Sequence, residues 1–358
     1  MVKNNLVANV ILVKIYCYYM KARNSILRHP SGIEIETPLL IPSYSSKGFS
    51  MDKNGVSEIN RPMFLCKEYL TESLLISAYD IYYKHIPKLE DFISTEIVFI
   101  DSGGYETSQL YDLSGVNKHP SNIKDWKPEF LDETLKNWPN RYPAIIVNFD
   151  HGSIRKSLDE QIAEASSLFG RHKNKLSDFI IKPEKLSNSE IPIDKIIKNI
   201  AALDNFDIIG FTEKELGNSI IKRMKSIYKI RMAMDKVKIK KPIHIFGCLD
   251  PISTILYFLV GAEIFDGLTW LKYSFIKGSA IYIYNFGAIN QDIGIHTSDE
   301  QVRIKSLTNN IYFLEKMKYL MKNFTTTKDF NSFDKLGFEN FGSFIESNFN
   351  DFQSNIKI

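Results

Sequence analysis

A chain of 358 residues, 44% hydrophobic and 13% aromatic, is too apolar for general disorder and long enough for an α/β barrel with additions. A net charge of only +3 excludes a protein that attracts polyanions over its whole surface, so a nucleic-acid surface would have to be local. The three cysteines lie far apart in the sequence, which excludes a zinc ribbon or a disulfide framework and favours a cytoplasmic location.

The first apolar segment covers residues 6–20 and is interrupted by Asn9 and Lys14. It is too short to span a bilayer, and no small-residue cleavage site follows it. We therefore expect paired strands here and no membrane partner.

Short apolar runs then alternate with helical patterns along most of the chain. Near-continuous apolar runs of this length are typical of parallel strands buried on both faces. The intervening segments 157–170 and 219–235 have helical periodicity, and no Gly-rich dinucleotide fingerprint is present. The pattern predicts a TIM (β/α)8 barrel rather than a Rossmann sheet. The strand-like runs are 74–80, 96–101, 144–150, 178–184, 206–211, 242–247 and 262–267.

Two regions depart from this alternation. Residues 111–142 contain two tryptophans and three prolines and predict a long insertion at the barrel rim. After His296, a capping box at 298–301 predicts one long amphipathic helix, followed by short packed helices in the Phe- and Asn-rich tail 324–358. We therefore divide the chain into a barrel with an N-terminal hairpin, 1–296, and a C-terminal helical extension packed on it, 297–358.

Acidic residues end several of the predicted strands. In a parallel barrel the C-terminal ends of the strands share one rim, so side chains from distant positions converge there. An aspartate after a strand also serves as a helix cap or turn former. The repetition favours a shared acidic site, with Asp80, Asp101, Asp150, Glu184 and Asp266 as candidates.

The stretch "DSGGYE" (101–106) resembles the D-S-G-G-[FY]-Q motif of the tRNA-guanine transglycosylase family. Five other segments resemble further motifs of that family, in the family's order. The resemblance covers roughly residues 20–275 and implies a TIM barrel that exchanges guanine in a nucleic acid for a 7-deazaguanine base. The five segments are "HPSGIEIETPLLIPSYSS" (29–46), "VNFDHGS" (147–153), "DIIGFTEKELGNS" (207–219), "IHIFGCLDP" (243–251) and "GAEIFDGLTW" (261–270).

The resemblance implies catalytic roles for two carboxyl groups. Breaking an N-glycosidic bond builds positive charge on the sugar, and a carboxylate can trap that cation covalently. By resemblance, Asp266 is this nucleophile, and Asp101 is the general acid/base that exchanges a proton with the departing and incoming bases.

The resemblance also implies a base-binding pocket. Gly103 and Gly104 would leave room for a flat base near the main chain, and Tyr105 would stack on it. Asp150 would accept hydrogen bonds from the Watson–Crick edge of the base, which must leave its stack to reach the site. The substrate-binding residues expected are Ser102, Gly103, Gly104, Tyr105, Asp150 and Gly210.

The sequence departs from the family pattern in four places. No cysteine follows Cys248, so the zinc site of the tRNA enzymes is absent, and we expect neither a metal nor a cofactor. Glu106 replaces the usual Gln, and "IKPE" replaces V-Q-G-G, which leaves Lys182 and Glu184 as candidates for the place of the base-recognising Gln. After the nucleophile, the basic stretch has become "TWLKYSF" and retains only Lys272.

Three functions remain open on the sequence. The first is a base-exchanging pentosyltransferase with a nucleic acid and a 7-deazaguanine base as partners, for which the lost zinc module favours DNA over tRNA. The second is a catalytically silent binding subunit, which the retention of both Asp101 and Asp266 argues against. The third is a hydrolytic N-glycosidase, since water would only have to replace the incoming base. A homodimer is also left open.

One basic stretch, residues 221–241, has nine Lys or Arg residues and one acidic residue. We favour a solvated outer helix face over a surface that follows phosphates, which would make binding salt-dependent.

Overall fold

The computed structural model describes residues 20–53, 55–108, 123–150, 152, 154–290 and 293–356. Eight parallel strands form one sheet in the order β3-β10-β9-β8-β7-β6-β5-β4. A parallel bridge between Ser43 and Leu75, with Tyr44 N–H donating to the Leu75 carbonyl at 2.8 Å, joins β3 to β4 and closes the barrel. The strands are β3 (Leu39–Pro42), β4 (Ser73–Ser77), β5 (Ile97–Asp101), β6 (Ala144–Val147), β7 (Leu176–Ile181), β8 (Ile208–Thr212), β9 (Ile243–Phe246) and β10 (Ile264–Gly267).

The strands alternate between two apolar clusters, as the period of two requires. One cluster fills the barrel and the other lies between the sheet and its helices. On β5, for example, Ile97 and Phe99 face the interior, while Val98 and Ile100 face the helices. The interior cluster includes Leu39, Ile41, Leu75, Ile145, Val147, Leu176, Ile180, Ile208, Phe246 and Ile264.

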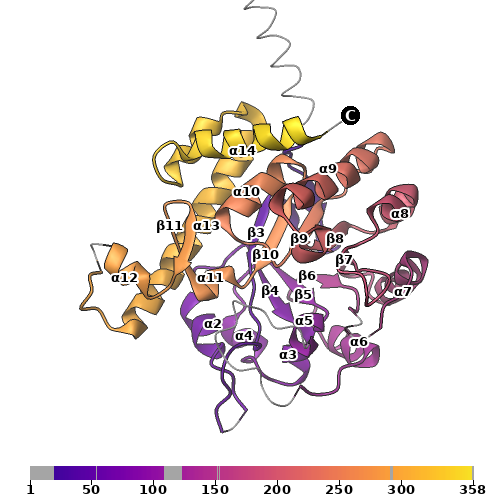
Figure 1. The fold of residues 1–358 in the computed structure, drawn as a ribbon. Coiled ribbons are helices and arrows are strands. Elements are labelled where there is room, and N and C mark those ends of the chain that lie inside the picture. The colour runs from indigo at the N-terminus through magenta and orange to yellow at the C-terminus, as the bar shows by residue number, and fades with distance from the viewer. Residues whose placement is uncertain are drawn as a thin grey trace, which may run out of the picture.

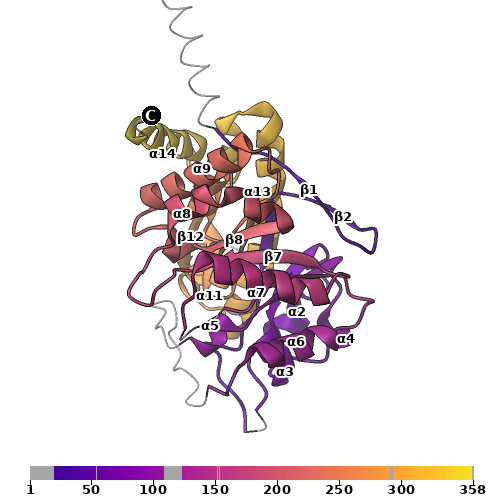
Figure 2. The same cartoon turned by 90° about the vertical axis from the view of Figure 1, so that its right-hand side faces the viewer.

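The predicted N-terminal hairpin is present. Strands β1 (Ile26–Arg28) and β2 (Glu34–Glu36) pair antiparallel and lead into β3. Leu27 and Ile35 are buried in the interior cluster, so the hairpin covers one end of the barrel (Figure 2). The apolar segment 6–20 lies outside the described residues except for Met20.

Helices surround the barrel, as the alternating pattern predicts (Figure 1). The predicted helices 157–170 and 219–235 are found within one residue of their expected bounds, and the Ser157 capping box opens the first. The helices up to β10 are α2 (Asn60–Cys66), α3 (Ala78–Tyr82), α4 (Leu89–Phe92), α5 (Gly104–Thr107), α6 (Pro128–Lys136), α7 (Leu158–Arg171), α8 (Ile193–Lys198), η1 (Ile200–Asn205), η2 (Glu213–Leu216), α9 (Ile220–Lys236) and α10 (Pro251–Leu259).

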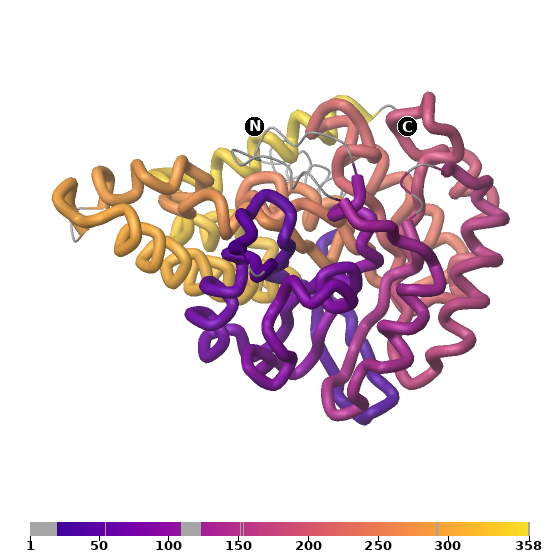
Figure 3. Tube along the Cα trace, turned by 90° about the horizontal axis from the view of Figure 1, so that it is seen from below, coloured from indigo at the N-terminus to yellow at the C-terminus, as the bar shows by residue number. Residues whose placement is uncertain are grey.

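The C-terminal part runs along one side of the barrel (Figure 3). The long helix α13 (Asp299–Thr327) begins at the Ser298 cap and packs against α2, α10 and β3. The tail forms η3 (Phe330–Lys335) and α14 (Phe341–Asn355), so it contains one long helix where short ones were expected. Buried phenylalanines from η3 and α14 hold this pair against α9, α10 and α13. Between β10 and α13 lie α11 (Thr269–Lys272), β11 (Tyr273–Ile276), β12 (Ser279–Tyr282) and α12 (Asn285–Ile289).

The first part of the predicted rim insertion, residues 111–122, lies outside the described residues. The remainder contains α6, and Trp126 and Trp138 pack inward against the core. Within the part of the chain that the structure describes, none of the helices has the length and apolar character that crossing a bilayer requires.

Candidate active site

Asp101 and Asp266 occupy interior positions at the C-terminal ends of their strands. Asp101 follows Phe99 by two residues on β5, and Asp266 follows Ile264 by two residues on β10, so both continue the faces that fill the barrel. Because the strands are parallel, both carboxyl groups point into the same mouth.

Hydrogen-bond donors surround the Asp266 carboxylate. Ser43 Oγ donates to Oδ2 at 2.7 Å, and Gly247 N–H donates to Oδ1 at 3.1 Å. On the same side His244 Nε2 lies 3.2 Å from Oδ1. Two hydrogen bonds and one ion-pair contact thus reach a carboxyl group that is otherwise buried.

His244 lies between two carboxylates inside the barrel. Its Nδ1 is 2.6 Å from Asp178 Oδ2, and both side chains are fully buried. Burial alone would lower the pKa of His244, but Asp178, and then Asp266, raise it to about 9. With a carboxylate at each ring nitrogen, the side chain is an imidazolium at neutral pH.

The surroundings of Asp101 differ from those of Asp266, because burial is the largest influence on the pKa of Asp101. Burial, and after it the negative charge of Asp266, raises the pKa of Asp101 to about 6, and the N–H groups of Ser102 and Gly103 offset part of this rise. Asp101 can therefore carry a proton near neutral pH, while the carboxyl of Asp266 has two hydrogen-bond donors and His244 beside it. Two carboxyl groups in such contrasting environments are the usual arrangement for an acid/base and nucleophile pair.

The turn after β5 is held by packing rather than left open for a ligand. Gly103 has φ of 87°, and a Cβ there would lie 2.7 Å from Trp126 Nε1. A Cβ on Gly104 would lie 2.7 Å from the Cβ of Asp150. We expected these glycines to leave room for a base. On the side of the backbone where a Cβ would point, this expectation is wrong, because Trp126, Tyr79 and Asp150 fill that space.

Other expected pocket residues have clear packing partners. Ser102 Oγ accepts from Asp150 N–H at 3.4 Å and so ties the turn to the next strand. Lys47 Nζ lies 4.4 Å from the centre of the Tyr105 ring and donates to the Tyr105 carbonyl at 2.7 Å. Gly210 faces the interior, where a Cβ would come within 2.5 Å of the Phe246 ring and 3.0 Å of Asp178 Oδ1.

Asp150 belongs to a group of four charges. Its carboxylate is 3.0 Å from Arg155 Nη1 and 3.3 Å from Lys182 Nζ. Lys182 also lies 2.9 Å from Glu215 Oε1 and donates to Thr212 Oγ1 at 2.9 Å. Burial would lower the pKa of Lys182, but Asp150 and Glu215 more than offset this and raise it, so Lys182 is an ammonium.

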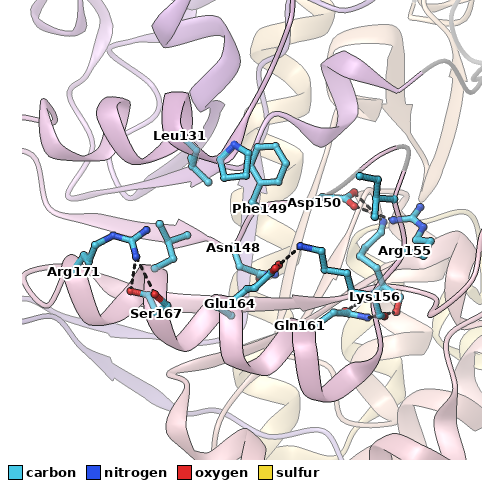
Figure 4. Close-up of a pocket in the computed structure, with 15 residues that line it drawn as sticks. Leu131, Asn148, Phe149, Asp150, Arg155, Lys156, Gln161, Glu164, Ser167 and Arg171 are labelled. Carbon is cyan, nitrogen blue, oxygen red and sulfur yellow. Dashed lines mark hydrogen bonds and ion pairs between the residues drawn. The ribbon is translucent and has the colours of Figure 1, made fainter.

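A cavity of about 240 Å³ adjoins this group (Figure 4). It lies over α6 and α7, with Leu131 and Phe149 on its apolar side and Asp150 and Arg155 at one end. It shares only Asp150 and Lys182 with the residues around the barrel mouth.

Two further carboxyl groups are buried next to the mouth. Glu106 accepts hydrogen bonds from Ser45 Oγ and from Ser77 Oγ, the second at 2.7 Å. Burial, and then the charges of Asp80 and Asp101, raises the pKa of Glu106 to about 8, so it is neutral near pH 7. Asp80 accepts from Ser46 N–H at 2.7 Å, from Ser46 Oγ at 2.5 Å and lies 3.1 Å from His85 Nδ1, which gives it a structural role.

The five acidic residues that were predicted to end strands do not all share a site, and Asp80 lies within helix α3. Glu184 accepts from Leu158 N–H at 2.7 Å and pairs with Lys195 at 2.6 Å, so its carboxylate is turned toward α7 and α8, outside the barrel. Of the two candidates for the base-recognising position, only Lys182 faces Asp150.

Sequence reasoning missed Asp178 and His244. The available signal was a charged residue inside an otherwise apolar strand run, because a buried charge requires a partner. Within the described residues, no group of three or more His, Cys, Asp or Glu side chains has the arrangement that could hold a metal ion. In comparisons with known proteins, no family model and no curated protein matches the chain.

Proposed function

We propose that this protein is a base-exchanging transglycosylase of the pentosyltransferase type. It would replace guanine in a nucleic acid with a 7-deazaguanine base. The observation that carries the proposal is the contrast between Asp101 and Asp266 at one barrel mouth: a carboxyl whose pKa is raised to about 6 beside a carboxylate surrounded by donors. The ordered set of motifs resembling the transglycosylase family supports it.

The reaction would proceed in two displacements. A lone pair of Asp266 attacks C1′ of the nucleotide, the C1′–N bond electrons pass to the base, and the base takes the proton of Asp101. The incoming base then gives a ring proton to Asp101 and attacks C1′, and the ester oxygen returns to Asp266 as a carboxylate. Two inversions restore the original anomeric configuration, as in retaining glycosidases.

We favour DNA as the polymer on sequence grounds. No cysteine follows Cys248, and the segment after the nucleophile keeps only Lys272 of the family's basic residues. Both features suit a substrate other than a tRNA anticodon arm.

The test is exchange of labelled guanine into polymer. The protein is incubated with radiolabelled guanine and either duplex DNA or bulk tRNA, and acid-insoluble label is counted. Label should enter DNA with the wild type and fall by orders of magnitude with Asp266→Asn or Asp101→Asn. Asp204→Asn removes an exposed carboxylate and should leave exchange unchanged. Binding of nucleic acid without exchange in either polymer would favour the silent binding subunit, and release of free guanine would favour a hydrolase.

A further inference from the structure

The Asp178–His244 pair takes no part in the two displacements, yet His244 lies 3.2 Å from the carboxyl group of Asp266. His244 is fully buried and stacks on Phe246 at 3.9 Å between ring centres, with Phe99 edge-on at 5.8 Å. Two aromatic rings and two carboxyl groups therefore contact it. A cation in such a place is costly unless its anions are fixed close by.

We propose that Asp178 and His244 form a positioning unit for the nucleophile, in which the imidazolium holds Oδ1 of Asp266 and leaves Oδ2 as the oxygen that attacks the sugar. This inference rests on the proposed function. Oδ1 accepts a hydrogen bond from the main-chain N–H of Gly247 at 3.1 Å and lies 3.2 Å from His244 Nε2, an ion-pair contact without hydrogen-bond geometry. Oδ2 has Ser43 Oγ, a hydroxyl that can rotate away when the sugar arrives.

The charges balance over the reaction. With His244 protonated and the carboxyl groups of Asp178 and Asp266 ionised, the three groups carry one net negative charge, which favours the cationic sugar. In the ester intermediate Asp266 is neutral, and the Asp178–His244 pair is neutral as a whole. His244 keeps its proton throughout and stabilises the carboxylate again when the incoming base displaces it.

Asp178 fixes the orientation of the ring. Its Oδ2 lies 2.6 Å from Nδ1, and the other ring nitrogen, Nε2, then lies 3.2 Å from Asp266 Oδ1. Gly210 makes room for Asp178, since a Cβ there would lie 3.0 Å from Asp178 Oδ1. The interior of the barrel thus places three charged side chains from β7, β9 and β10 in one row.

The first test uses wild-type protein and needs no substrate. The imidazole nitrogens of His244, assigned by their loss in His244→Gln, should titrate near pH 9 in ¹⁵N NMR spectra. In Asp178→Asn the titration should move below that value, since the first of the two carboxylates is gone. Titration of wild-type His244 at or below the ordinary value for histidine would overturn the proposal.

The second test is kinetic. His244→Gln should lower kcat for base exchange by about 10²-fold or more with KM changed only a few-fold, because binding is left intact.

In Asp178→Asn, the alkaline limb of the kcat–pH profile should move to lower pH, because His244 then loses its proton at a lower pH. The double variant Asp178→Asn/His244→Gln should be more active than His244→Gln alone, since it no longer leaves the buried carboxylate of Asp178 without its cation.

His172→Gln is the matched control. His172 is also buried and lies 2.9 Å from Asp132, but on the outer helices, so its loss should leave kcat and the pH profile unchanged. Exchange by His244→Gln at the wild-type rate with an unshifted profile would overturn the positioning role while leaving the proposed function standing. Absence of exchange in the wild type, with the His244 titration near pH 9 intact, would instead overturn the proposed function.

Discussion

Lys182 and Asp150 face each other across the ends of β7 and β6, with Lys182 Nζ 3.3 Å from Asp150 Oδ2. In the proposed reaction the carboxylate would accept from the N–H groups of the base, and the ammonium, which contacts Asp150, Glu215 and Thr212, would donate to the base's carbonyl in place of one of them. An adjacent donor and acceptor of this kind discriminate between purines by their hydrogen-bonding edge.

Lys182→Met should therefore raise KM for guanine by about 10- to 100-fold, the value of a hydrogen bond to a charged group. Glu184→Gln is the control from the same strand end, whose carboxylate faces α7 and α8, and should leave KM unchanged. Steady-state kinetics with varied guanine measure both. A KM within twofold of the wild type in Lys182→Met would exclude a contact with the base.

Glu106→Gln should stabilise the protein at neutral pH. Between the ordinary pKa of 4.5 and the folded value of about 8, the folded state keeps a proton on Glu106 that the unfolded state loses, so wild-type stability falls as pH rises through this window. An amide carries no such cost and can bond to Ser45 and Ser77. The gain should be small at pH 4.5, grow to at most about 5 kcal/mol at pH 8 and then level off.

Denaturant unfolding at several pH values measures this difference, with the exposed Glu339→Gln as control. A Glu106→Gln protein that is less stable than the wild type at pH 8 would contradict the expected gain. The same neutral state explains why a glutamic acid can stand where the resembling motif has glutamine.

Arg231→Met should destabilise the fold by about 3–5 kcal/mol, because it leaves a buried carboxylate without its cation. Arg231 Nη2 donates to Glu263 Oε1 at 2.9 Å, and both side chains are fully buried. Lys229→Met, exposed on the same helix, should change the free energy of unfolding by less than about 0.5 kcal/mol. A loss below 1 kcal/mol for Arg231→Met would contradict the pairing. Arg231 is thus one basic residue of 221–241 that does not reach the surface.

Purified protein should contain well under one zinc per chain, because the region after Asp266 has no cysteines. Metal analysis by mass spectrometry measures the content, and a chelator should leave the unfolding temperature unchanged. Stoichiometric zinc whose removal unfolds the protein would contradict the absence of a structural site.

The strand runs and the positions of Asp101 and Asp266 could be predicted because apolar runs mark buried strands, and parallel strands end at one rim. The partners of the charged groups could not be predicted. Whether Glu184 faces the mouth or the helices depends on local turn geometry, and the row Asp178–His244–Asp266 depends on register between strands far apart in sequence. The reason that residues 103 and 104 are glycines could not be predicted either, because Trp126 and Asp150, which would collide with a Cβ there, come from other segments of the chain.

The central claim is that Asp266 forms a covalent bond with the sugar. It is tested most directly by incubating the protein with labelled DNA, or tRNA, in the absence of an incoming base and separating the mixture under denaturing conditions. The account predicts a protein–nucleic acid adduct with the wild type and, at reduced yield, with Asp101→Asn, and none with Asp266→Asn. An adduct of wild-type yield with Asp266→Asn would show that another group attacks the sugar.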